Sequence, residues 1–501
     1  MKNLISTVLL IASLCASIVY AGPDVQIGGV VIRGTQSNGL ESFLGIRYAK
    51  PPVGEARWQA PEPLLVPAKN MLADAYGPAC LQPESPYHSI TSTSEDCLFL
   101  NIWRPEGAQH LPVVFWIHGG GFRTGSGQIN GEHFASSGVI VVSINYRLGP
   151  LGFFAHPSLG NGAANYGLLD MIAALQWVNT NIEAFGGDPE RVTLMGLSAG
   201  AMAVNMLATS DDAAGLFSRA IAHSSYTTWP LLRSVGAPLP GYDGGGLRPD
   251  KSAEQAAVDV ASRAGATEQS PTSLRALDAV ALINALDGFQ LPIVDGISLR
   301  EEPWALLADP SRKRVPMIIG GNSFEGAVMP ATGVSENTFR QYIGTYDSAL
   351  RSAYASDFEV SDQQGYARAF GDYRYLLSAW ESMSAYSDNG DLGWMYYIDI
   401  PEPPVGLPQG TAHGRDMMLL WGMEGLTPQQ QAVSDEMHQR WALFIGGLDP
   451  QLPDSAHWPQ WNNESPRWLR FGADVTTEAP TMTERMNILR AIHQQRVKRR
   501  S

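Results

Sequence analysis

Residues 192–200 have the sequence Val-Thr-Leu-Met-Gly-Leu-Ser-Ala-Gly, and this stretch decides the fold. The apolar run 192–195 predicts a buried parallel strand, and the helix-compatible run 201–207 follows the motif. A Gly-x-Ser-x-Gly motif between a strand and a helix is typical of a nucleophile elbow, whose strained turn lifts a serine hydroxyl out of the sheet. Glycines flank the serine because larger side chains would clash in so sharp a turn. We therefore expect Ser198 to be a nucleophile at the end of a sheet.

Short apolar runs alternate with helical stretches along the chain. The runs 113–117, 139–144, 192–195, 220–222, 317–319 and 394–400 predict strands. Apolar residues at helical spacing in 168–182 predict a helix between two of them. This alternation predicts an α/β fold with a large, mainly parallel central sheet flanked by helices. We interpret residues 226–307, which include a Gly- and Pro-rich loop at 236–249, as an excursion or lid above the sheet rather than a separate domain.

Composition and charge limit the classes of function. The chain has 501 residues, 44% of them hydrophobic, and a net charge of −15, which argues against nucleic acid and anionic membranes as partners. Residues 1–21 have the features of a secretory signal, with a basic start, an apolar middle and Val-Tyr-Ala before Gly22. We expect residues 22–501 to form one secreted or periplasmic domain without a membrane anchor. The two later cysteines, Cys80 and Cys97, are then expected to form a disulfide.

A glycine-rich loop, His-Gly-Gly-Gly-Phe at 118–122, follows the predicted strand 113–117. Three glycines allow a loop to approach a ligand closely and to point backbone N–H groups into one cavity. Such donors stabilise an oxyanion where its charge develops. The loop also precedes the serine motif by one strand–helix–strand unit, as expected for an oxyanion hole of this fold class.

A serine nucleophile needs a base, and the histidine follows it in this fold class. The histidines after Ser198 are His223, His413, His438, His457 and His493. His413 lies in a loop after the strand run 394–400, which is a strand-end position on the catalytic side. His438 and His493 lie on polar helical segments and are expected to be solvated, as is the basic tail 496–500. His223 ends a buried strand and is expected to be a satisfied core residue, while His457 lies in a Trp- and Pro-rich loop.

The candidate acid is Glu325, which follows the strand run 317–319 in a segment bracketed by glycines. Most carboxylates are solvated surface charges, but this position just past a buried strand favours Glu325 as the acid. No Cys/His cluster has metal spacing, and neither a metal nor a cofactor is expected.

Further motifs occur in a fixed order. They are the N-terminal stretch 44–57, Ser-Glu-Asp-Cys-Leu-Phe-Leu-Asn at 94–101, Asn-Tyr-Arg at 145–147, and the stretches 165–170, 185–189, 216–224, 289–292 and 295–296. With the serine motif they resemble the type-B carboxylesterase/lipase family, which includes the cholinesterases, over nearly the whole mature chain. The resemblance implies an α/β-hydrolase fold.

The resemblance also implies roles for individual residues. Ser198 corresponds to the nucleophile, Glu325 to the orienting acid and His413 to the base. The implied oxyanion donors are the N–H groups of Gly120, Gly121 and Ala199. The resemblance further implies that Ser224 is a buried supporting serine. It implies that Cys80 and Cys97 form the family's first disulfide and that Arg57 pairs with Glu95.

Several positions depart from the family pattern. Leu197 stands where the family usually has Glu, and Ala201 replaces a Gly after the motif. The loop between the two cysteines has no Trp, which cholinesterases use to bind choline by a cation–π contact, so choline esters are poor candidates. Ala266 lies near the position of a second-disulfide cysteine, which suits the bacterial branch. Phe122 and Arg123 follow the oxyanion loop as candidate pocket residues, and Arg123 either favours anionic esters or is a structurally paired arginine.

The sequence thus predicts a serine carboxylic-ester hydrolase that acts through an acyl-enzyme on small to medium esters, with xenobiotic and anionic esters left open. One alternative is a lipase for longer acyl chains, which an exposed apolar lid would favour. Another is a non-catalytic cholinesterase-like binding protein. Amide or carbamate hydrolysis and the oligomeric state stay open.

Overall fold

The computed structural model describes residues 22–85, 90, 92–160, 162–237, 251–400, 410–422 and 425–498. The predicted signal at 1–21 lies outside the described residues, as do most of the loop 236–249 and the last three residues of the chain.

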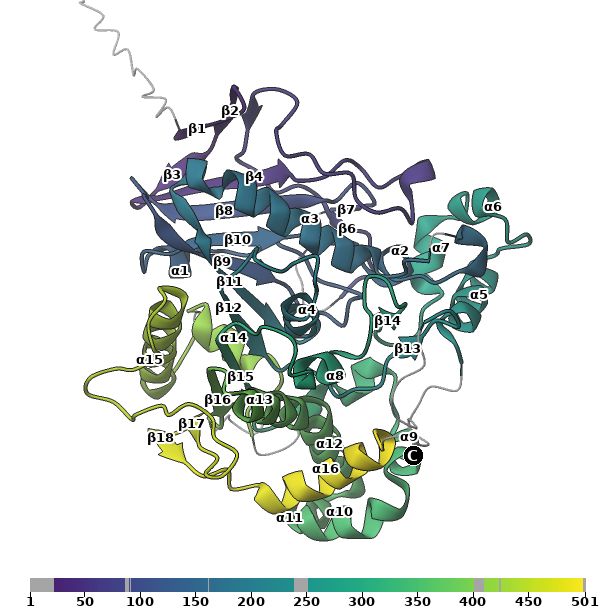
Figure 1. Cartoon of the computed structure of the whole chain (residues 1–501), viewed down its shortest axis with the longest axis vertical. Helices are drawn as coiled ribbons and strands as arrows, with labels where there is room; N and C mark the ends of the chain where they lie inside the picture. Colours follow the sequence, from purple (N-terminus) through teal and green to yellow (C-terminus); the bar gives the residue numbers. More distant parts are fainter. Residues whose placement is uncertain are drawn as a thin grey trace, which may run out of the picture.

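An 11-stranded sheet forms the centre of the molecule in the order β18-β17-β16-β15-β12-β11-β9-β10-β8-β4-β3 (Figure 1). Its inner strands, from β17 to β10, pair in parallel. They are β9 (Leu111–Ile117), β10 (Ile140–Ile144), β11 (Gly187–Leu197), β12 (Arg219–His223), β15 (Met317–Asn322), β16 (Gly393–Ile398) and β17 (Trp468–Phe471). Six of them contain the predicted strand runs, so the mainly parallel sheet is confirmed.

The two edges of this sheet are antiparallel. One edge holds β8 (Phe99–Pro105), β4 (Leu40–Arg47) and β3 (Thr35–Ser37), and the other holds β18 (Val475–Glu478). Small sheets outside it contain β1 (Asp24–Ile27), β2 (Val30–Arg33), β5 (Met71–Leu72), β6 (Ala79–Cys80) and β7 (Thr93–Ser94).

Helices cover both faces of the central sheet, as predicted. Successive strand residues alternate between two apolar layers, so that Phe115 packs with the helices of one face and Val114 with those of the other. The first face is covered by α3 (Tyr166–Asn181), α4 (Ala199–Ala208) and α13 (Leu377–Asn389). The second is covered by α1 (Glu132–Ala135), α14 (Arg415–Leu420) and α15 (Pro428–Ile445).

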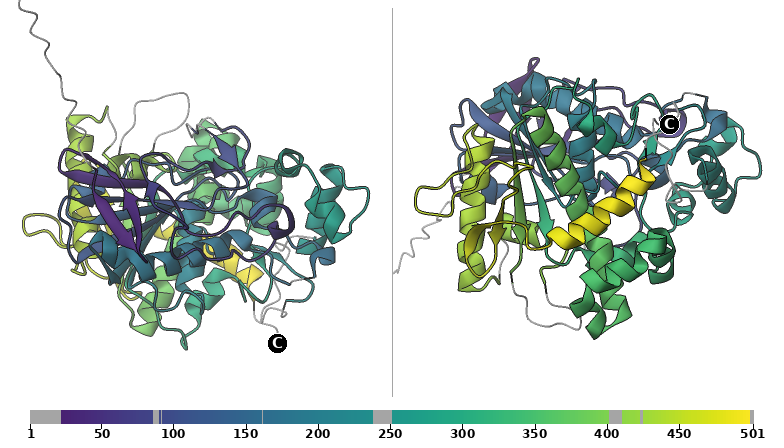
Figure 2. Two further views of the ribbon diagram at one scale, coloured as in Figure 1. Left: turned by 90° about the horizontal axis from the view of Figure 1, so that it is seen from above. Right: turned by 60° about the horizontal axis from the view of Figure 1, so that its bottom comes forward.

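The predicted excursion protrudes at one side of the sheet, as the teal helices in both views of Figure 2 show. It contains α5 (Ala253–Arg263), α6 (Pro271–Arg275) and α7 (Ala279–Asn284), whereas α8 (Pro303–Ala308), at the end of the predicted excursion, packs on α13 and α4. Its two ends are joined where β13 (Leu232–Arg233) pairs with β14 (Ile293–Val294). Arg57 anchors it to the body through hydrogen bonds to the carbonyl oxygens of Arg275 and Leu277.

A second helical group follows β15 and lies at the bottom of the molecule in Figure 1. It contains α9 (Glu336–Ile343), α10 (Asp347–Ala353), α11 (Ala355–Val360) and α12 (Asp362–Gly371). One π-helical turn, η7 (Asp372–Leu376), joins α12 to α13. The short α2 (Gly149–Gly152) and the C-terminal α16 (Thr483–Arg496) complete the helices of the described chain.

Three sequence predictions about exposure are wrong. His438 on α15 is 8% exposed and His493 on α16 is 3% exposed, so neither side chain is solvated. Arg496 was expected in a solvated tail, yet it is 2% exposed, ends α16 and forms an ion pair of 2.9 Å with Glu302. These polar side chains are buried because α15 packs on the sheet and α16 on the helical layer, and a partner satisfies the Arg496 charge.

Among the described helices, none combines the length and the apolar character that a membrane crossing would need.

Candidate active site

Ser198 sits at a tight turn between β11 and α4. Its backbone has φ 55° and ψ −115°, a conformation that L-residues rarely adopt outside strained functional turns. A Cβ atom on Gly200 would lie 2.0 Å from the carbonyl oxygen of Ile117, and one on Gly196 would lie 2.5 Å from the carbonyl carbon of Gly200. The two motif glycines are therefore needed because strand and helix approach too closely for any side chain. The elbow that the sequence predicts is formed.

Glu325 and His413 lie together beyond the carboxyl ends of β15 and β16. Glu325 is fully buried, and its Oε2 contacts Nδ1 of His413. The loop of His413 is joined to the loop of Glu325, since Phe324 N donates to Thr411 O at 2.8 Å and Thr411 N donates to Ser323 Oγ at 2.8 Å. This pairing aligns the imidazole with the carboxylate before any ligand arrives.

The other oxygen of Glu325 is held by three donors. Its Oε1 accepts from Ser224 Oγ at 2.6 Å, from Asn322 N at 2.6 Å and from Asn322 Nδ2 at 3.2 Å. Ser224 therefore contacts the acid that the resemblance implied it would support. Donors to an ionised carboxylate favour the charged form.

Ser198 lies on the same side of the sheet as these two residues, but no hydrogen bond joins its Oγ to His413 in the described structure. Tyr375, on η7, contacts the imidazole with 4.6 Å between ring centroids.

The glycine-rich loop lies beside the elbow. Gly120 has φ 104°, and a Cβ there would lie 2.1 Å from Thr124 O, while a Cβ on Gly121 would lie 2.3 Å from the Phe289 ring. Their carbonyl oxygens accept from Thr124 N at 3.0 Å and Gln290 N at 2.9 Å, which fixes the peptide planes.

The N–H groups of Gly120, Gly121 and Ala199 donate to no acceptor in the described structure. Gly121 and Ala199 are buried and Gly120 is half-buried, and N–H groups at such positions usually have an acceptor. These are the donors that the sequence comparison implied for an oxyanion. Their role as oxyanion donors stays a prediction.

The loop that follows Cys80 braces the glycine-rich loop. Gln82 Oε1 accepts from Gly125 N at 2.7 Å, and Gln82 Nε2 donates to Gly125 O at 2.8 Å and to Cys80 O at 2.9 Å. Cys80 and Cys97 form a disulfide, as predicted. Sequence reasoning missed Gln82 because no motif marks it.

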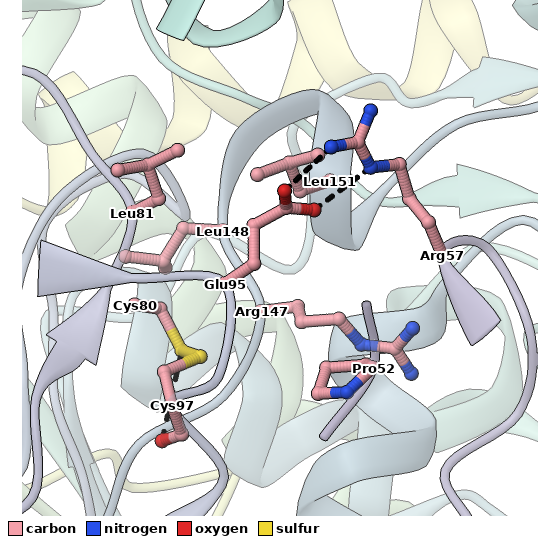
Figure 3. A pocket seen from close by; sticks show the side chains of 9 residues that line it. All are labelled: Pro52, Arg57, Cys80, Leu81, Glu95, Cys97, Arg147, Leu148 and Leu151. Atoms are coloured by element: carbon pink, nitrogen blue, oxygen red, sulfur yellow. Dashed lines mark hydrogen bonds and ion pairs between the residues drawn. A yellow bond between two sulfur atoms is a disulfide. The ribbon is translucent and has the colours of Figure 1, made fainter. Parts of the chain in front are cut away.

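Figure 3 shows a small cavity beside that disulfide, in which Arg57 and Glu95 form the expected ion pair. Its lining also includes Arg147, whose guanidinium pairs with Asp170 at 2.7 Å. None of the lining residues belongs to the elbow, the glycine-rich loop or the Glu325–His413 pair. Each charged side chain of the lining has an ion-pair partner, so the cavity belongs to the supporting structure rather than to the site.

The two candidate pocket residues have contacts within the protein. The Phe122 ring is fully buried against Phe153, with 5.0 Å between ring centroids. Arg123 Nη1 donates to Gly288 O at 2.8 Å, and burial lowers the pKa of Arg123. Their substrate roles stay predictions.

A second buried imidazole–carboxylate pair lies next to Glu325. His223 Nδ1 lies 3.1 Å from Asp416 Oδ2, and His223 Nε2 accepts from Trp441 Nε1 at 3.1 Å. His223 is thus the satisfied core residue that the sequence predicts. Asn322 Nδ2 links the two acids, since it also donates to Asp416 Oδ1 at 3.1 Å. No group of His, Cys, Asp and Glu side chains in the described residues is arranged to hold a metal ion.

The α/β-hydrolase class is defined by three features at one edge of the sheet. They are a serine at a turn between a strand and a helix, an acid–histidine pair later in the chain, and a glycine-rich loop. The model of the carboxylesterase family matches residues 21–489, and the chain belongs to this family. It is accordingly an enzyme, a carboxylesterase, and the alternative of a non-catalytic binding protein is set aside.

Relatives and solved structures agree with this assignment. The chain is 33% identical to fumonisin B1 esterase of Sphingopyxis macrogoltabida, over 89% of this chain and 87% of that protein. It is 32% identical to para-nitrobenzyl esterase of Bacillus subtilis, over 91% and 96%. A para-nitrobenzyl esterase structure superposes with a TM-score of 0.79 at 30% identity, covering 93% of this chain and 99% of that one. A Geobacillus stearothermophilus carboxylesterase gives 0.78 at 28% identity, with the same coverage.

Proposed function

We propose that this carboxylesterase is a serine hydrolase in which Ser198, His413 and Glu325 form the catalytic triad. The single observation that carries the proposal is the buried Glu325 carboxylate, which contacts His413 Nδ1 on the side where the elbow presents Ser198. That contact selects the tautomer whose Nε2 is free to accept the serine proton.

In the proposed mechanism, Ser198 Oγ attacks the ester carbonyl carbon while His413 Nε2 takes the hydroxyl proton. The C=O electron pair moves to oxygen, and the N–H groups of Gly120, Gly121 and Ala199 stabilise the oxyanion. His413 then gives its proton to the leaving alcohol as the C–O bond breaks. Water activated by His413 hydrolyses the acyl-enzyme and releases the acid.

The proposed substrates are small to medium carboxylic esters. The names of the relatives fumonisin B1 esterase and para-nitrobenzyl esterase support ester substrates, whereas a preference for longer acyl chains would indicate a lipase. We also propose export and cleavage before Gly22 to give one domain over 22–501, which the disulfide supports because such bonds persist in oxidising compartments. N-terminal sequencing of the exported protein tests the cleavage site.

The function is tested by hydrolysis of p-nitrophenyl esters from acetate to palmitate, with Ser198→Ala as control. We expect turnover of the short esters, and we expect the variant to lose it. Preference for palmitate would replace the esterase proposal by the lipase alternative. Equal turnover by the variant would exclude Ser198 as the nucleophile.

A further inference from the structure

A buried arginine without an acidic partner lies beside the proposed triad. Arg374 on η7 is 2% exposed, and neither its Nε nor its Nη2 has a hydrogen-bond partner in the described structure. Among the described residues, no ion pair joins Arg374 to a carboxylate. Buried charges in proteins are normally paired, because removing an ion from water is costly. An arginine of this kind therefore needs an explanation beyond packing.

Aromatic rings surround this guanidinium. Its central carbon lies 4.2 Å from the centroid of the Tyr226 ring, 4.4 Å from that of Trp229 and 5.6 Å from that of Tyr375. Cation–π contacts with three rings offset part of the desolvation of the charge. These contacts hold the cation in place but bring no negative charge to it.

Two tyrosine hydroxyls in the same cluster are also unpartnered. Tyr226 OH and Tyr375 OH are buried and make no hydrogen bond of normal geometry in the described structure, although Arg374 lies close enough to both phenols to interact with them. The two rings meet edge to face, with 5.8 Å between their centroids. A guanidinium and two phenols form a set of donors without an anion to accept from them.

The cluster is continuous with the reacting groups. Tyr375 contacts the His413 ring, and Tyr226 lies two residues after Ser224, which holds Glu325. Burial raises the pKa of Tyr375, and both Arg374 and the nearby Ser198 hydroxyl act against that rise. The Ser198 hydroxyl thus lies near the phenol, although the two do not form a hydrogen bond of normal geometry.

We propose that Arg374, with Tyr226 and Tyr375, forms a subsite for a carboxylate carried by the ester substrate. The proposal rests on the function proposed above and specifies its substrate class as esters with a free carboxylate on the acyl or the alcohol part. A guanidinium donates two parallel N–H groups to a carboxylate, and the charge that the subsite lacks arrives with the substrate. Tyr375 contacts both Arg374 and His413, so the subsite adjoins the reacting groups through this ring.

Arg123 is the arginine for which the sequence analysis left open a preference for anionic esters. It differs from Arg374 because its Nη1 already donates to Gly288 O and because Asp287 lies near enough to raise its pKa against the effect of burial. The structure therefore favours Arg374 as the residue that selects anionic esters, and Arg123 serves as a matched arginine in the test.

The test compares charged and neutral partners of the same shape. The acyl pair is the p-nitrophenyl monoester of adipic acid and its methyl ester, and the alcohol pair is 4-acetoxybenzoate and methyl 4-acetoxybenzoate. The ratio of kcat/KM values within each pair is measured for the wild type, Arg374→Gln, Arg374→Lys and Arg123→Gln. We expect the wild type to prefer the charged member of one pair, which identifies the part that carries the carboxylate.

In that pair, Arg374→Gln should lower the charged-to-neutral ratio about 10- to 100-fold, as expected for loss of a hydrogen bond to a charged group. Arg374→Lys should restore part of the ratio, and Arg123→Gln should leave it unchanged. If Arg374 only acted on Glu325 or on packing, both members of a pair would lose activity equally and the ratio would not change. A wild type that prefers the neutral member of both pairs, or a fall of the ratio only in Arg123→Gln, would overturn the proposal.

A binding measurement separates this proposal from the proposed function. In the Ser198→Ala background, calorimetry should show tighter binding of the charged ester, and Arg374→Gln should remove the difference. Equal affinities for the charged and neutral esters would overturn the subsite even if the triad is correct. Conversely, neutral esters hydrolysed equally well by Ser198→Ala would overturn the triad and leave the binding result intact.

Discussion

Ser224 Oγ donates a 2.6 Å hydrogen bond to Oε1 of Glu325, which leaves Oε2 of the same carboxylate for His413. The two oxygens of one buried acid thus have separate tasks. One is fixed by the protein, and the other orients the imidazole. A substitution that removes a hydrogen bond to Oε1 should therefore lower the rate of catalysis, because it lets Oε2 and the imidazole that it orients shift.

We predict that Ser224→Ala lowers kcat about 10-fold or more, with little change in KM. The variant removes one donor to a charged acceptor, worth about 1.5–3 kcal/mol, while the two Asn322 donors keep the acid in place. Steady-state kinetics on p-nitrophenyl butyrate measure the effect. The matched control is Ser225→Ala, whose hydroxyl accepts from Asn205 Nδ2 at 2.8 Å and does not touch Glu325. Equal kcat values for the two variants would contradict the prediction.

Gln82→Ala should lower kcat about 10-fold. Loss of one oxyanion donor lowers kcat about 10²- to 10³-fold, and a loop that is less firmly held should have a smaller effect. Gln82 holds both backbone groups of Gly125, three residues after the glycine-rich loop. Gln128→Ala is the control, since Gln128 Nε2 donates instead to Gly77 O at 2.9 Å. The account fails here if Gln82→Ala lowers the melting temperature but retains full kcat.

The disulfide should stabilise the fold. Cys80 and Cys97 are 17 positions apart, and closing a loop of this size is worth about 3 kcal/mol in the chain-entropy model. The double variant Cys80→Ala/Cys97→Ala should lose about that much free energy of unfolding in urea. A reductant should lower the stability of the wild type to the same level and leave the variant unchanged. A reductant effect of equal size on both proteins would show that it does not act through this bond.

Acid should destabilise the protein partly through His438. Burial and then the neighbouring His133 lower the pKa of His438 to about 4, whereas an unfolded histidine has a pKa of about 6.5. Between these values the unfolded chain binds the proton and the folded chain does not, so stability falls as the pH falls through this window. The free energy of unfolding is measured in urea at pH 7 and at pH 5. Its decrease between these pH values should be smaller by about 2 kcal/mol in His438→Gln than in the wild type. The exposed His457→Gln is the control and should lose as much as the wild type.

The elbow, the glycine-rich loop and the acid–histidine pair could be predicted because local sequence determines their geometry. Gly196 and Gly200 are required by contacts within a few residues or with the adjacent strand, and Glu325 directly follows its strand. The antiparallel edge strands β3, β4, β8 and β18 were not predicted, since polar residues interrupt them and they lack the continuous apolar runs of the parallel core.

Other features depend on tertiary contacts that no motif records. Arg374 and Tyr375 lie in a helical segment whose composition looks ordinary, and only the fold brings them to His413. The burial of His438, His493 and Arg496 was missed because polar helices do not reveal which face packs on a neighbour. Asp416, which pairs with His223, follows His413 by three residues but is marked by no spacing that sequence reasoning could use.

The most direct test of the central claim is covalent labelling with a fluorophosphonate, followed by peptide mapping by mass spectrometry. The account predicts one adduct per chain, on Ser198, with none in Ser198→Ala and much slower labelling in His413→Ala. An adduct on another serine, or labelling of Ser198 at the same rate in His413→Ala, would contradict a nucleophile that this histidine activates.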